Sequence, residues 1–112
     1  MDREALKRQA MDLLGNEEPV RAKACAAALC ESGPDDAQAW VLLAAAQLQL
    51  GELESAESAS RRALQLNPDD VFAHTGLVRA LLQGNKQAQA IEALRGLISI
   101  APNHAEAHSA GE

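Results

Sequence analysis

The sequence predicts an all-α fold built from helix pairs that repeat along the chain, and three observations predict it. Prolines recur every 34 residues, at Pro34, Pro68 and Pro102. Alanines recur at the same interval, at Ala22, Ala56 and Ala90. Between the prolines, apolar residues follow helical spacing and are interrupted once per repeat by a turn. A fixed period of this length made of paired helices is typical of a solenoid.

Six helices are expected, two in each repeat. Apolar spacing and helix-stopping residues place them at residues 2–14, 19–31, 37–50, 53–66, 70–83 and 86–100. Pro19 suits a first helical turn, where its missing N–H is not needed. We expect Gly15-Asn16 to end the first helix as a left-handed cap. Helix 37–50 is apolar nearly all round, so it is expected to be the innermost helix.

Helix 53–66 is amphipathic. Its charged residues are expected to face water, with Glu57 and Arg61 forming an exposed pair that contributes ~0.3 kcal/mol. Gly76 and Gly96 lie inside predicted helices, where each costs ~1 kcal/mol relative to alanine. Gly76 therefore either permits close helix packing or leaves space for a ligand.

The repeat carries a recognisable pattern of a Trp, a Leu before a small residue, and later an Ala and a Pro. In the middle repeat these are Trp40, Leu43, Ala44, Ala56, Ala63 and Pro68. The chain resembles the tetratricopeptide repeat family along essentially its whole length. The resemblance implies a right-handed solenoid within a single domain over residues 1–112. The repeats would span about 3–36, 37–70 and 71–104, followed by a partial fourth first helix at 105–112.

Composition restricts the partners. The net charge of −6 argues against a nucleic acid, because that binding relies on clustered Lys and Arg. No apolar run approaches the ~20 residues of a membrane span. The N-terminal stretch MDREALKRQA lacks the apolar segment of a signal peptide. We therefore expect a cytoplasmic protein that binds neither nucleic acid nor membrane.

The sequence offers no catalytic arrangement, so we predict no enzymatic activity and no cofactor or metal. Cys25 and Cys30 point about 140° apart on one helix and are poorly placed for a disulfide. His104 and His108 are spaced as metal ligands can be, yet His74 and His108 continue the 34-residue series begun by Trp40. Both histidines in that series are interpreted as packing residues.

The family resemblance further implies protein binding in a groove lined by the first helix of each repeat. Mapped onto this sequence, the predicted groove is mainly apolar, with Arg79 as its most distinct charge. The candidate contact residues are Lys7, Met11, Leu14, Gln38, Leu42, Ala45, Leu48, Phe72, Thr75, Arg79 and Leu82. Leu42→Glu is expected to weaken partner binding and to leave helicity intact.

Some members of the family hold acidic C-terminal tails of heat-shock chaperones in a clamp of two Lys, two Asn and one Arg. Lys7 matches the first clamp position, whereas the other four are Met11, Leu42, Phe72 and Gly76. We therefore expect no carboxylate clamp. An apolar groove suits a hydrophobic peptide or an amphipathic helix instead.

Three alternatives remain open. The groove can be filled by the chain itself or by self-association, because a broad apolar surface usually has an occupant. The repeats can recruit substrates to, or regulate, an enzyme outside this segment. The third alternative is a homo-oligomer formed through helix 86–100, whose apolar face is followed by only a short segment.

Overall fold

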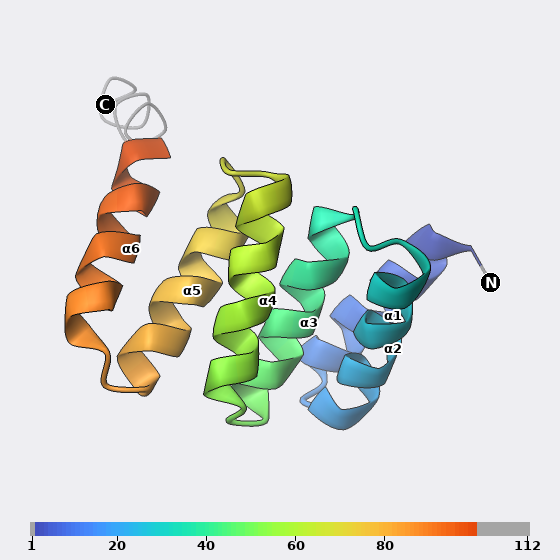
Figure 1. Ribbon diagram of the computed structural model, residues 1–112. Helices are drawn as coiled ribbons and strands as arrows, with labels where there is room; N and C mark the ends of the chain where they lie inside the picture. Colours follow the sequence, from blue (N-terminus) through green and yellow to red (C-terminus); the bar gives the residue numbers. More distant parts are fainter. Residues whose placement is uncertain (1, 101–112) are drawn as a thin grey trace, which may run out of the picture.

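The computed structural model describes residues 2–100, and every regular element in that range is an α-helix (Figure 1). The helices are α1 (Arg3–Gly15), α2 (Pro19–Ser32), α3 (Ala37–Gln49), α4 (Leu53–Leu66), α5 (Val71–Gln83) and α6 (Gln87–Ile100). The predicted all-α solenoid is confirmed, with helix ends that agree to within one residue. The predicted partial helix at 105–112 lies outside the described residues.

The helices form three successive antiparallel pairs, which stack side by side in a row (Figure 1). The middle first helix, α3, packs against α1, α2, α4 and α5. Six of its side chains are buried, among them Leu43 and Gln47. This confirms the prediction that α3 is the innermost helix. Small side chains permit the close packing, because Ala22, Ala56 and Ala90 are each at most 2% exposed.

Aspartates spaced 34 residues apart begin the three first helices. The carboxylates of Asp2, Asp36 and Asp70 accept hydrogen bonds from backbone N–H groups two or three residues further on. These N–H groups have no partner within the helix, so each aspartate acts as an N-cap. The repeat therefore fixes where each first helix starts as well as where the chain turns.

The turn between the two helices of each repeat also recurs. One residue there adopts the left-handed conformation in each repeat, with φ of 59° at Glu17, 77° at Gly51 and 60° at Asn85. The expectation of a left-handed cap at Gly15-Asn16 was wrong, because Asn16 has φ of −90° and the left-handed residue is Glu17. Glycine and asparagine tolerate this conformation more readily than glutamate.

A third contact recurs in the turns that precede α3 and α5. Trp40 Nε1 donates to the Pro34 carbonyl at 2.9 Å, and His74 Nε2 lies 2.8 Å from the Pro68 carbonyl. A carbonyl only accepts hydrogen bonds, so Nε2 carries the proton of His74. The interpretation of His74 as a packing residue is confirmed, whereas His108 lies outside the described residues.

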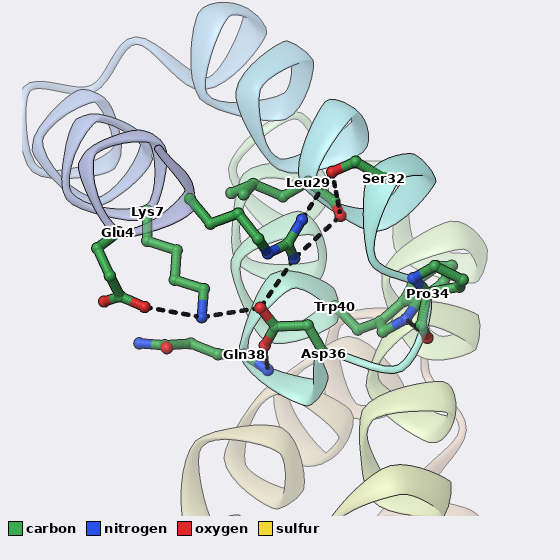
Figure 2. Close-up of polar contacts among 9 residues, drawn as sticks. Glu4, Lys7, Leu29, Ser32, Pro34, Asp36, Gln38 and Trp40 are labelled. Carbon is green, nitrogen blue, oxygen red and sulfur yellow. Dashed lines mark hydrogen bonds and ion pairs between the residues drawn. The ribbon is translucent and has the colours of Figure 1, made fainter. Parts of the chain in front are cut away.

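One ionic cluster joins the first repeat to the second (Figure 2). Asp36 Oδ2 accepts from Lys7 Nζ at 2.8 Å and from Arg3 Nη2 at 2.9 Å. The Arg3 guanidinium also donates to Ser32 Oγ and to the Leu29 carbonyl. Asp36 therefore caps α3 and links it to α1, while Arg3 links α1 to the end of α2.

The surroundings of Asp36 favour its charged form. Desolvation opposes ionisation, but the hydrogen bonds from Lys7 and Arg3 outweigh it and lower the pKa of Asp36 below its usual 3.8. The hydrogen bond to Asp36 likewise raises the pKa of Lys7 above its usual 10.5. The stability that Asp36 contributes is therefore complete above pH 3.8 and is lost as the pH falls through its folded-state pKa.

Two ion pairs occupy equivalent positions in successive repeats, and the positive and negative partners are exchanged between them. Lys23 Nζ lies 2.6 Å from Glu52 Oε1, which joins the first repeat to the second. The equivalent positions one repeat later hold Glu57 and Lys86, 3.0 Å apart. The expectation that Glu57 faces water was wrong, because its side chain is only 19% exposed and the hydrogen bond from Lys86 lowers its pKa. The reversal disfavours pairing between the wrong repeats, since Lys23 would then meet Lys86.

We predict that Asp36→Asn lowers the free energy of unfolding by about 1–2 kcal/mol at neutral pH, because asparagine keeps the N-cap and loses the charge. Urea unfolding followed by circular dichroism measures the loss. The difference from the parent should stay constant down to about pH 3.8 and then shrink as the pH falls through the lower folded-state pKa of Asp36, where the parent becomes protonated as well. A difference that is independent of pH would contradict the ionic role.

We predict that Glu57→Lys lowers the free energy of unfolding by about 1 kcal/mol, because it places a third cation beside Lys86 and Arg61. Adding Lys86→Glu should recover at least half of that loss by recreating the charge order of the Lys23–Glu52 pair. Thermal unfolding of the three proteins tests this. Glu54→Lys, on the exposed part of α4, is the matched control and should be nearly neutral. Losses that simply add would contradict a direct pairing.

Candidate functional site

The face formed by α1, α3 and α5 contains a pocket of about 550 Å³, here called the first pocket. Its floor is apolar, and polar groups lie at its edge where α3 and α5 begin. It is lined by Met11, Leu14, Asp36, Ala37, Gln38, Val41, Leu42, Ala45, Asn67, Asp70 and Phe72. The C-terminal half of α1 and the N-terminal half of α3 therefore provide most of its wall.

A smaller second pocket of about 150 Å³ lies between α3 and α5. It shares Val41, Ala45 and Phe72 with the first pocket, so the two are neighbours along one groove. The remaining lining residues are Ala44, Leu48, Ser60, Ala73, Thr75, Gly76 and Arg79.

The two pockets are equivalent under the 34-residue repeat. Met11 and Leu14 of the first pocket correspond to Ala45 and Leu48 of the second. On the opposite wall, the series Gln38, Val41, Leu42 and Ala45 corresponds to Phe72, Thr75, Gly76 and Arg79. The groove is therefore one site built twice, with different side chains in each copy.

Most of the predicted contact residues lie along this groove. The first pocket brings together Met11, Leu14, Gln38, Leu42, Ala45 and Phe72. The second adds Leu48, Thr75 and Arg79. Two of the predicted residues, Lys7 and Leu82, line neither pocket. Leu82 is 54% exposed and is the repeat equivalent of Leu14 and Leu48, on the side of α5 away from the first repeat.

Lys7 and Leu42 differ from their predicted roles. Lys7 is 9% exposed and its ammonium is held by Asp36 and Glu4, so it is part of the link between repeats (Figure 2). Leu42 lines the first pocket but is only 6% exposed and packs in the core. Leu42→Glu would bury a charge, so the structure leads us to expect a loss of helicity in place of the intact helicity predicted from the sequence.

The sequence reasoning missed Val41, which lines both pockets. Helical spacing places Val41 on the groove face, because Val41 lies three residues after Gln38 and four before Ala45. It also missed the polar edge formed by Asp36, Asn67 and Asp70. In the sequence those residues lie at helix ends and turns, and only the stacking of repeats brings them to the edge of a pocket.

Among residues 2–100, no group of three His, Cys, Asp or Glu side chains is placed to hold a metal ion. His104 lies outside that range. Cys25 and Cys30 are both free, and burial raises the pKa of Cys30 to about 11. Such a thiol is unreactive near neutral pH. None of the helices described is long and apolar enough to cross a membrane.

Comparison with solved structures shows the same fold in proteins of low sequence identity. The TPR2AB domain of yeast Sti1, in complex with pHSP90, matches with a TM-score of 0.87 and 19% identity over 96% of this chain and 42% of that chain. MamA from Desulfovibrio magneticus RS-1 gives a TM-score of 0.83 and 23% identity over 89% of this chain and 56% of that chain. The present chain thus spans about half the length of both structures.

A third similar structure is the type III secretion translocator chaperone SycD of Yersinia enterocolitica. It matches with a TM-score of 0.88 and 18% identity over 97% of this chain and 83% of that chain. No curated protein matches the sequence.

Two family models, both described as tetratricopeptide repeat, match residues 7–71 and 55–111. The first match alone covers more than half of the chain. It includes the N-caps Asp36 and Asp70, the buried alanines Ala22 and Ala56, and the turn prolines Pro34 and Pro68. By these matches and by its stacked helix pairs, the chain belongs to the tetratricopeptide repeat family.

Proposed function

We propose that this chain is a protein-interaction module that binds an apolar segment of a partner protein along the groove formed by the two pockets. One observation supports it most. Met11 is 53% exposed and Phe72 is 76% exposed, and both border the first pocket. Large apolar side chains exposed around a concave surface are a common mark of a binding site. Repeat solenoids use extended surfaces of this kind for binding.

The proposed ligand differs from the acidic tails bound in a carboxylate clamp. Lys7, the single match to the clamp, has its ammonium committed to Asp36 and Glu4. Phe72 and Gly76 provide no charge at two of the other clamp positions. Sti1 is recorded in complex with pHSP90, and that binding belongs to Sti1. For the present chain, an apolar segment is favoured by the lining of the first pocket.

Self-association is the second candidate, and a separate surface favours it. Ile91, Leu94 and Ile98 follow helical spacing on α6 and are 53%, 43% and 59% exposed. Ile91 is the repeat equivalent of Lys23 and Glu57, which each form an ion pair with the following repeat. A second copy of the chain could cover this stripe. Light scattering that reports a strict monomer at high concentration would exclude this candidate.

To test the groove, the chain is immobilised and a random-peptide phage library is selected on it. We expect enrichment of peptides with large apolar residues. Met11→Glu and Phe72→Glu, made separately, should each weaken the selected peptides about 10-fold or more, because burying one such side chain contributes about 1.5–3 kcal/mol. Circular dichroism should be unchanged, since both side chains are exposed.

The matched control is Ile98→Glu, an exposed apolar residue on α6 outside both pockets. It should leave peptide binding unchanged, and in light scattering it should abolish any self-association that uses α6. A library that yields no enriched peptide, or peptides insensitive to Met11→Glu and Phe72→Glu, would refute the proposed groove function.

A further inference from the structure

Three of the differences between the equivalent positions of the two repeats make the second pocket more polar or more open. Ser60 lines the second pocket, and its equivalent one repeat earlier is the buried Ala26. Gly76 replaces Leu42, and Arg79 replaces Ala45. Two neighbouring copies of one site have thus diverged, and the second, which is otherwise lined mainly by apolar residues, adds a hydroxyl and a guanidinium to its lining.

The floor of the second pocket holds a hydroxyl without a partner. Ser60 is fully buried, and its Oγ makes no hydrogen bond within the described part of the chain. A Cβ added at Gly76 would lie 3.1 Å from that Oγ. Gly76 therefore leaves no side chain between the pocket and Ser60, whose hydroxyl lies buried directly beneath the lining. A buried hydroxyl that lacks a partner favours a ligand atom able to accept its hydrogen bond.

A cation lies at the side of the same pocket. Arg79 lines it and is exposed, and no acidic side chain within residues 2–100 forms an ion pair with it. Lys7, the other basic residue predicted for the groove, is instead paired with Asp36 and Glu4. An exposed guanidinium without an ion-pair partner and a buried hydroxyl without a partner line the same pocket, and both favour an anionic group there. Charge-assisted hydrogen bonds of this type are strong when they are shielded from water.

We infer that the second pocket receives a carboxylate side chain, Asp or Glu, from the same partner segment whose apolar side chain enters the first pocket. This inference rests on the proposed function. Arg79 binds the carboxylate, and Ser60 makes the floor polar. The partner is thus an extended peptide with one apolar anchor and one acidic anchor, which differs from a purely hydrophobic ligand.

The repeat sets the distance between the two anchors. Packed helices lie ~8–10 Å apart. The equivalent walls of the two pockets belong to neighbouring first helices, α1 and α3 on one side and α3 and α5 on the other. In an extended polyproline-type segment, residues three apart point to the same side and lie ~9 Å from each other. The partner should therefore carry its apolar and acidic residues three positions apart.

The phage selection described above reads this spacing directly. Support would be enrichment of an acidic residue three positions from a large apolar residue, in one chain direction. Enriched apolar peptides with no acidic preference at that spacing would overturn this inference and leave the proposed function intact. Failure to enrich any peptide would refute the proposed function itself, so the two failures are distinguishable.

A double-mutant cycle then assigns the acidic anchor to Arg79. On a selected peptide, Glu→Gln at the acidic position and Arg79→Gln in the protein should each weaken binding about 10-fold, a loss of ~1.4 kcal/mol. Together they should cost no more than either alone, because each removes the same contact. Arg95→Gln, on the exposed part of α6, is the matched control and should have no effect. Losses that multiply would overturn the assignment to Arg79.

Two further variants separate the charge from the shape of the pocket. Selection on Arg79→Glu should exchange the acidic preference for Lys or Arg at the same position. Gly76→Ala should fill the bottom of the second pocket by placing a methyl group against Ser60. It should therefore reduce the affinity for Glu-containing peptides while folding is retained. An unchanged acidic preference on Arg79→Glu would contradict the inferred contact.

Discussion

The fold depends on close contact between helices through alanine. Ala26, Ala39, Ala46, Ala56 and Ala63 are all buried, and aromatic residues make up only 2% of the chain. Small side chains let helix backbones approach, and dispersion contacts then accumulate along each interface. The larger apolar side chains are not all needed in such a core. Several of them, Phe72 above all, are left on the surface of the groove.

Alanine contacts hold helices together but specify poorly which helices meet, because every repeat presents a similar surface. The polar contacts supply that order. Within residues 2–100, the Asp36 cluster occurs where the first repeat meets the second and has no counterpart at the next junction, where Ala37 and Val41 replace Arg3 and Lys7. The Lys23–Glu52 and Glu57–Lys86 pairs carry opposite charges at equivalent positions, so a misplaced repeat would bring like charges together. These pairs contribute more to the order of the stack than to its total stability.

The sequence was sufficient for the fold because the repeat is local. Turn prolines, capping aspartates and helical spacing each act within a few residues, and they agree in all three repeats. The groove was predicted less well, because exposure depends on contacts between repeats. Lys7 resembles a groove residue in the sequence, yet its ammonium reaches Asp36 on the next first helix. Leu42 lies on the correct face but is covered by its neighbours.

The residues that distinguish the second pocket from the first reduce the stability of the fold. Gly76 lies inside α5, where glycine is less stable than alanine by ~1 kcal/mol. Ser60 leaves a buried hydroxyl without a partner, where the equivalent Ala26 has no polar group to satisfy. The two unfavourable features are neighbours, because a Cβ added at Gly76 would lie 3.1 Å from Ser60 Oγ. Local conflicts that coincide in space, beside an uncommitted arginine, are more typical of a binding site than of a packing defect.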